Sequence, residues 1–111
     1  MTSISKYDVV IVRFPFASSL KYKARPAVVV SSNLYNKNTR NTLLILAISS
    51  SNENKLDFEI NIDAWKDAGL LKPSIFKSAI ATIEKEFIMA KVGSLSIGDR
   101  GQLEKMIKKI Y

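Results

Sequence analysis

The sequence predicts a single, mainly β domain: a small barrel of about five to seven short strands, with one short helix and an amphipathic helix at the C-terminus. Runs rich in Val, Ile and Leu recur between polar loops, which is the pattern of short strands. Near the C-terminus the hydrophobic spacing changes to that of a helix. A chain of 111 residues buries one core and has no room for a second lobe. We therefore assign residues 1–111 to one domain.

The first half of the chain predicts three strands. Residues 7–14 form a β-rich run that ends at a proline, and a polar, basic loop over 17–24 leads to a second strand at 25–31. Residues 33–41 are Asn-rich and predict a loop that contains a helical turn. The third strand, 42–48, is apolar without interruption, which favours burial on both of its faces.

The second half predicts further strands and the two helices. Residues 57–62 alternate strictly, which predicts a strand with its apolar side chains inward and its charges outward. A short helix at 64–68 is expected to end at Gly69, a common left-handed terminator. Two more strands, 78–83 and 88–93, flank a charged turn.

The C-terminal segment has the clearest helical pattern in the chain. Ser96 and Asp99 make an S-x-x-D capping pattern at its start. Its apolar positions follow i, i+3, i+4, i+7 spacing, which predicts an amphipathic helix packed on the sheet. These positions are Leu103, Met106, Ile107 and Ile110.

Missing residue types narrow the possible functions. The chain has no Cys and no His, so a thiolate nucleophile, a zinc knuckle, a zinc hydrolase and a histidine-pair ribonuclease are all excluded. We expect no metal and no cofactor. No apolar run reaches the roughly 20 residues of a membrane span, and the first residues do not form a signal-peptide stretch. We therefore expect a cytoplasmic protein that does not contact membranes.

The net charge of +7 is concentrated in the first half of the sequence. Residues 1–50 contain seven basic residues and one acidic residue, whereas residues 51–111 contain ten and nine. Such an excess favours binding to nucleic acid. Lys21, Lys23 and Arg25 surround Tyr22, and an aromatic ring among cations can stack on a base. A basic surface without any partner is the plain alternative.

A cation and a hydroxyl cluster come together if the second and third strands pair. Pro26 keeps Arg25 out of the helical region, which predicts that Arg25 stands at the entry of a buried strand. Ser49 and Ser50 follow the exit of the next strand. Guanidinium and hydroxyl donors at one edge of a sheet suit the binding of a phosphate. Because alternate residues point to opposite faces, only one serine should face Arg25, and we favour Ser49.

A family resemblance spans nearly the whole chain. The motifs that carry it are YDVVIV at 7–12, FPF at 14–16, KARPAVVVSS at 23–32, LAISS at 46–50, WKDAGL at 65–70, KPS at 72–74, ATI at 81–83 and VGSLS at 92–96. In their order and spacing they resemble the MazF/PemK-type toxins of bacterial toxin–antitoxin pairs. Two positions depart from the family pattern. Tyr7 replaces a usual Gly, and Phe76-Lys77-Ser78 stands where some relatives have an Arg and an Asp.

The resemblance implies an SH3-like barrel of the MazF/Kid/CcdB-like toxin fold. It further implies a homodimer that cleaves single-stranded RNA without a metal and so inhibits translation and growth. A cognate antitoxin would cover the RNA groove, with DNA contacted only through the toxin–antitoxin complex. The catalytic pair it implies is Arg25 and Ser49, where many relatives have Thr, and the loop at 17–24 would contact RNA and antitoxin.

The chemistry of RNA cleavage assigns further roles. Attack by the 2′-OH needs donors for charge on phosphorus, which Arg25 can supply with five N–H groups, while Ser49 can donate or relay a proton. No general base is identified; Asp8 is the only carboxylate in the basic half, and a role in anchoring a turn is open to it. The candidates for RNA binding are Arg13, Lys21, Tyr22, Lys23, Ser50 and Lys77.

Three other readings stay open. A toxin of the same fold could poison DNA gyrase without catalysis, although such relatives use an apolar, Trp-containing C-terminus and this chain ends Lys109-Ile110-Tyr111. A small barrel that only binds nucleic acid would need no more than the basic half. A degenerate toxin would keep the fold and lack activity.

Overall fold

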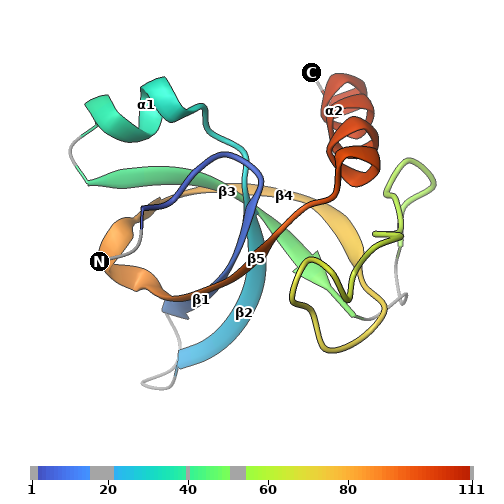
Figure 1. Ribbon diagram of the computed structural model, residues 1–111, viewed down its shortest axis with the longest axis horizontal. Helices are drawn as coiled ribbons and strands as arrows, with labels where there is room; N and C mark the ends of the chain where they lie inside the picture. The colour runs from blue at the N-terminus through green and yellow to red at the C-terminus, as the bar shows by residue number, and fades with distance from the viewer. Residues whose placement is uncertain (1–2, 16–21, 40, 51–54, 111) are drawn as a thin grey trace.

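One curved sheet with a helix at each end makes up the structure. The computed structural model describes residues 3–15, 22–39, 41–50 and 55–110. Within them, five antiparallel strands pair in the order β4-β3-β2-β1-β5 (Figure 1). The elements are β1 (Asp8–Pro15), β2 (Tyr22–Val29), α1 (Asn33–Asn38), β3 (Thr42–Ser49), β4 (Ile75–Glu84), the 3-10 helix η1 (Lys85–Phe87), β5 (Ile88–Ser94) and α2 (Ile97–Ile110). The mainly β prediction is confirmed.

The middle strand β3 contributes to two hydrophobic clusters, as its uninterrupted apolar sequence predicts. Leu43 and Ile45 belong to a cluster with β1 and β2 residues, and Leu46 and Ile48 belong to a second cluster that includes α2. All four side chains are almost completely buried. Strand β3 is therefore fixed from both faces, and its C-terminal end is a rigid point of the fold.

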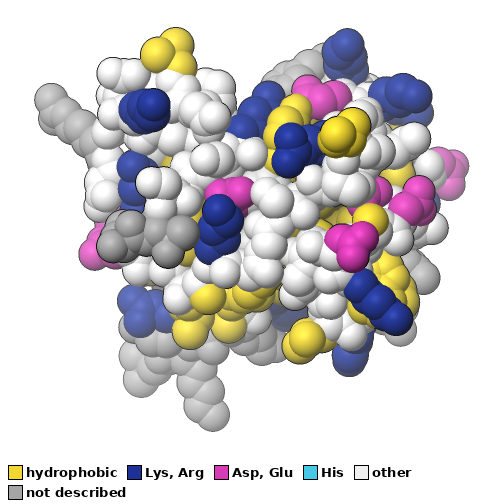
Figure 2. All heavy atoms as spheres, viewed as in Figure 1, with side chains coloured by type: hydrophobic (Ala, Val, Ile, Leu, Met, Phe, Trp, Pro, Cys, Tyr) yellow, Lys and Arg dark blue, Asp and Glu magenta, His cyan; other side chains and the backbone are white. Residues whose placement is uncertain are grey.

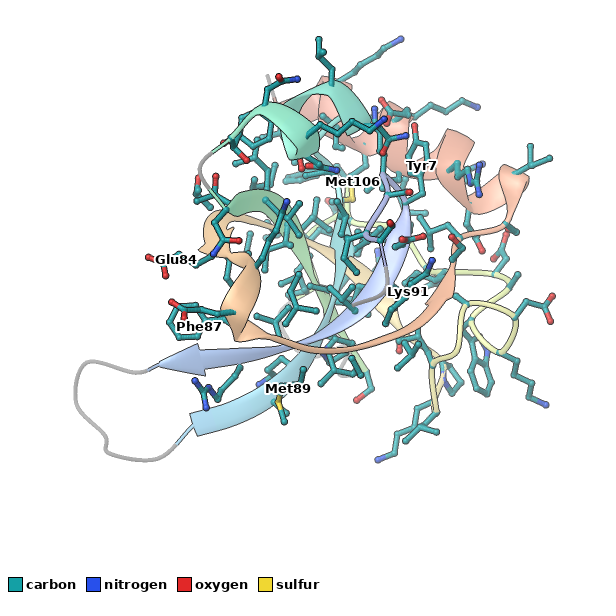
Figure 3. All side chains as sticks on the ribbon, turned by 60° about the vertical axis from the view of Figure 1, so that its left-hand side comes forward. Tyr7, Glu84, Phe87, Met89, Lys91 and Met106 are labelled. Atoms are coloured by element: carbon teal, nitrogen blue, oxygen red, sulfur yellow. The ribbon has the colours of Figure 1, made fainter. Side chains whose placement is uncertain are left out.

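Helix α2 covers one side of the sheet, as the spacing of its apolar residues predicts. Leu103 and Met106 are fully buried against β1, β2 and β3 residues, and Met106 lies between the helix and the sheet (Figure 3). The Ser96 hydroxyl accepts a hydrogen bond from the Asp99 N–H at 3.2 Å, which confirms the cap. No helix in the described part of the chain has the length and apolar character needed to cross a membrane.

Two predicted elements between β3 and β4 are wrong in type, although their apolar side chains pack inward as predicted. Residues 57–62 form no strand, because only Asn61 makes a bridge, to Ile75. Residues 64–68 form turns with a single i to i−4 bond, and they end at Gly69 with φ +87°. Apolar side chains from both segments still pack on the second cluster, so burial and not local propensity decides their place.

Tyr7 adopts a backbone conformation that favours glycine. Its φ is +73°, in the left-handed region, immediately before β1. The ring compensates by packing on α2: its hydroxyl donates to Glu104 at 2.7 Å, and the Arg100 guanidinium lies 5.1 Å from its centroid (Figure 3). Glycine adopts this φ without strain, which explains why a Gly would be usual here. In this chain the Tyr7 side chain links the start of β1 to α2.

Candidate functional site

A gap between β2 and β3 brings Arg25 and Ser49 into one groove. The β2–β3 ladder runs from Val29–Ile45 to Ala27–Ala47, and beyond it β2 pairs only with β1. Pro26 has no N–H to continue a ladder. Arg25 and Ser49 both lie beyond the last paired residues of this ladder, and both line the groove. Arg25 lies within β2 and not at its entry, since the strand begins three residues earlier than predicted.

The groove has a volume of about 400 Å³ and a mixed lining. Its polar lining residues include two cations and several hydroxyl groups. Its apolar lining residues are aliphatic side chains from the strands and from the β3–β4 connection. Among the described lining residues there is no carboxylate. The lining consists of Ile11, Ala24, Arg25, Pro26, Ile48, Ser49, Ser50, Gly69, Leu70, Leu71, Lys72 and Ser74. This composition suits an anionic group attached to an apolar body, such as a nucleotide.

Both predicted serines, Ser49 and Ser50, line the groove, so lining the groove does not by itself distinguish one from the other. Ser49 is the last residue of β3 and pairs with Ile75 of β4, which holds its backbone in place. Ser50 follows the strand and is exposed. Because both serines line the groove, the choice of Ser49 stays a prediction.

Gly69 and Gly93 let the turn before β4 approach strand β5 closely. A Cβ on Gly69 would lie 2.2 Å from the Val92 carbonyl oxygen, and a Cβ on Gly93 would lie 2.4 Å from the Ala68 carbonyl oxygen. The turn before β4 and strand β5 therefore meet backbone to backbone, which only glycine allows. This contact fixes the start of the segment that carries Leu70, Leu71 and Lys72.

Arg13 and Lys77, both predicted to bind RNA, do not line this groove. The Arg13 guanidinium lies over the Phe87 ring at 5.7 Å. Lys77 forms an ion pair with Glu59 at 3.4 Å and lines a separate hollow with it. The predictions for Lys21, and for the side chains of Tyr22 and Lys23, lie outside what the structure describes.

Asp8 anchors a turn, the role that the sequence left open to it. It is 3% exposed. Its carboxylate accepts hydrogen bonds from the Ser5 N–H and the Ser94 hydroxyl and pairs with Lys91 at 3.2 Å. The Ser5 bond holds the turn before β1, the Ser94 and Lys91 contacts tie the start of β1 to β5, and Asp8 does not line the groove.

Glu59 was expected to point outward, and this expectation is wrong. It is 3% exposed, because its carboxylate accepts hydrogen bonds from the Leu56 N–H and from both the N–H and the hydroxyl of Ser78. Burial alone would raise the pKa of Glu59. The hydrogen bonds and the Lys77 ammonium outweigh that effect and lower its pKa to about 2. Glu59 is thus a fixed anion that holds the 55–59 segment on β4.

The sequence reasoning missed Lys72, the second cation of the groove. Its residue type gave no signal, because the second half of the chain holds ten basic residues of similar appearance. The available signal was its position directly before Pro73, in a motif already recognised. Only the turn at Gly69 brings this segment to the ends of β2 and β3.

Overall charge does not locate the site. Figure 2 shows Lys and Arg side chains scattered over the face seen there, with acidic side chains among them, and no single basic patch. In the part of the chain that the structure describes, no three His, Cys, Asp or Glu side chains gather into a metal-binding group. What distinguishes the groove is that its described lining includes two cations and no acidic side chain.

Comparisons with known proteins bear on the family and the fold of the chain. A family model described as "PemK-like, MazF-like toxin of type II toxin-antitoxin system" matches residues 5–111. A search of curated proteins by sequence finds no match.

Solved structures share the fold at low sequence identity. A mycobacterial endoribonuclease in complex with its cognate antitoxin has a TM-score of 0.75 and 14% identity, covering 96% of this chain and 93% of that chain. The Mycobacterium tuberculosis toxin MazF-mt6 has a TM-score of 0.73 and 19% identity, covering 92% and 93%. A MazE-MazF structure from Deinococcus radiodurans has a TM-score of 0.75 and 13% identity, covering 96% and 94%.

Proposed function

The chain belongs to the family of PemK-like, MazF-like toxins of type II toxin–antitoxin systems, and from this premise we propose that it is an endoribonuclease that cleaves single-stranded RNA in the groove of Arg25 and Ser49. The observation that carries the proposal is the convergence of these two residues from different strands on one groove whose described lining holds no carboxylate. A groove with cations and hydroxyl donors attracts a phosphodiester and does not repel it.

The proposed reaction uses the RNA's own 2′-OH as the nucleophile. The 2′-oxygen loses its proton and bonds to the adjacent phosphorus, the bond to the 5′-oxygen breaks, and that oxygen leaves with a proton. The products are a 2′,3′-cyclic phosphate and a 5′-OH. Arg25 stabilises the negative charge that builds on the non-bridging oxygens, and Ser49 donates a hydrogen bond to the same phosphoryl group. No step requires a metal.

The biological setting is proposed from the family. The toxin would cut mRNA in the cytoplasm with some sequence selectivity, and so stop translation and growth. A cognate antitoxin would inhibit it, as the described mycobacterial and Deinococcus complexes pair such toxins with antitoxins. We propose a homodimer as the working form, with DNA contacted only through the toxin–antitoxin complex.

The test is cleavage of a long single-stranded RNA by the purified protein in excess EDTA, with cut sites and end groups identified. Discrete cuts that leave 2′,3′-cyclic phosphate and 5′-OH ends, and that disappear with Arg25→Ala and weaken with Ser49→Ala, are expected. A Ser50→Ala variant is the matched control and should retain most activity. A folded wild-type protein that cuts none of several RNAs would refute the proposal and leave gyrase poisoning or simple nucleic-acid binding to be tested.

A further inference from the structure

Three lysines among the described residues are neutralised by a carboxylate. Lys6 pairs with Glu104, Lys77 with Glu59, and Lys91 with Asp8, all within 3.5 Å. Arg25 and Lys72, in contrast, have no carboxylate within ion-pair distance among the described residues, although they line the same groove. Two cations that line one groove can each bind a negatively charged group of the same ligand.

The backbone at Lys72 is held in place although the residue is exposed. Pro73 confines Lys72 to extended conformations. The Ser74 hydroxyl donates to the Lys72 carbonyl at 2.8 Å, and Ser74 is itself 7% exposed. On the other side, Leu70 is buried and its N–H donates to the Trp65 carbonyl at 3.0 Å. The chain is thus fixed two residues before and two residues after Lys72, which presents the ammonium group from a defined point.

The groove that both cations line also has an apolar part. Ile48 and Leu70 are buried side chains that line it, together with Pro26. Apolar side chains of this kind accept a ribose or a base edge and not a phosphate. A lining that combines cations and hydroxyls with apolar side chains suits a nucleic acid strand, in which phosphates alternate with sugar and base.

We propose that Lys72 is a second phosphate-binding residue of the groove, and that it contacts the phosphate next to the one held by Arg25. The proposal deepens the endoribonuclease function and rests on it for the identity of the ligand as single-stranded RNA. Lys72 acts here as a point charge that positions the strand, whereas Arg25 contacts the reacting phosphate. A strand fixed at two neighbouring phosphates keeps the 2′-OH and the phosphorus in place for attack.

The experiment measures binding of a fully 2′-O-methylated single-stranded RNA, which has no 2′-OH to attack, over a series of salt concentrations. Each cation that contacts a single strand contributes about 0.7 to the slope of log K against log salt. Lys72→Ala is expected to lower the slope by about that amount, and Lys72→Arg is expected to retain it. The matched control is Lys105→Ala, which removes the same charge from an exposed position of α2 outside the groove and should leave the slope unchanged.

A second readout uses cleavable RNA. Lys72→Ala is expected to lower kcat/KM on the order of tenfold, the loss of one charge-assisted contact, with most of the change in KM. Lys72→Arg should recover most of it. Circular dichroism of each variant shows whether the fold is retained.

The outcomes separate the inference from the proposed function. If the wild-type protein binds the methylated RNA and cuts no RNA, the endoribonuclease proposal fails while the slope still decides the role of Lys72. If Lys72→Ala and Lys105→Ala give the same slope and the same kcat/KM, Lys72 is only a surface lysine and the inference is overturned, even with an active enzyme. Absence of any RNA binding by the wild-type protein overturns it as well.

Discussion

The groove and the buried carboxylates of this protein use charge in opposite ways. Asp8, Glu59 and Asp99 are each at most 3% exposed, and each accepts hydrogen bonds from at least two donors. Arg25 and Lys72 are exposed, share a groove, and have no acid beside them in the described part of the chain. The hydrogen-bonded carboxylates fix loops to the sheet, whereas Arg25 and Lys72 are the charges that we propose to bind a ligand.

This difference shows why residue type is a poor guide to function in this chain. The carboxylates are the residues that a search for a general base would select, yet all three are occupied with holding structure. Asp99, for example, accepts from the Asp63 and Ala64 N–H groups at 3.0 Å each, so it joins α2 to the 63–69 turn. What distinguishes the two kinds of charged residue is whether the side chain already has hydrogen-bond partners in the fold, and not its residue type. Three predictions test the contrast, and a fourth tests the backbone strain at Tyr7.

The largest effect is expected from removal of the groove's central cation. Arg25→Ala should lower kcat for RNA cleavage on the order of a hundredfold to a thousandfold, about 3 to 4 kcal/mol of transition-state stabilisation. The melting temperature should stay within about 2 °C of wild type, because Arg25 is exposed and no ion pair is lost. Single-turnover cleavage and thermal melting measure the two quantities. A large fall in melting temperature would show that Arg25 belongs to the structural group of charges.

The next effect concerns the pH dependence contributed by Glu59. Its folded-state pKa of about 2 lies below the usual 4.5, so the unfolded chain takes up the proton first as the pH falls. The stabilisation is complete above pH 4.5, is lost progressively toward pH 2, and amounts to about 3 kcal/mol. Urea denaturation of wild type and Glu59→Gln between pH 2 and 6 measures it. The stability gap between the two proteins should shrink as the pH falls, and a constant gap would contradict the assignment.

A smaller loss is expected at the junction of α2. Asp99→Asn replaces one acceptor oxygen by a donor facing backbone N–H groups, which should cost about 2 kcal/mol of unfolding free energy. Asp67→Asn, an exposed carboxylate in the same turn, is the control and should change stability by less than about 0.5 kcal/mol. Chemical denaturation gives both values. Cleavage by the folded Asp99→Asn protein should be unchanged, which a catalytic role for Asp99 would not allow.

The smallest effect separates backbone strain from side-chain contact at Tyr7. Tyr7→Ala loses the bond to Glu104 and keeps an unfavourable φ of +73°, whereas Tyr7→Gly loses the same bond and relieves the φ. The glycine variant should therefore be the more stable of the two by about 1 kcal/mol. Equal stabilities would mean that the backbone relaxes once the ring is removed. Urea denaturation at one pH is sufficient.

The fold was largely predictable because its signals are local. The uninterrupted apolar run of β3 required two buried faces, and the spacing of Leu103 and Met106 required a helix against the sheet. The 57–62 segment was misassigned because alternation does not show whether backbone groups find a partner strand or whether a charged side chain finds buried donors. Its backbone makes one bridge, at Asn61, and its Glu59 carboxylate turns inward to Ser78.

The sequence by itself placed Arg25 near the start of one strand and a serine pair at the end of the next, because Pro26 and the two apolar runs are local features of the chain. Only the tertiary structure decided that Lys72 joins them and that Asp8 and Glu59 do not. That outcome depends on the backbone contact between Gly69 and Val92 and on which carboxylates find donors. Because such contacts join residues that are far apart in the sequence, no local sequence pattern predicts them.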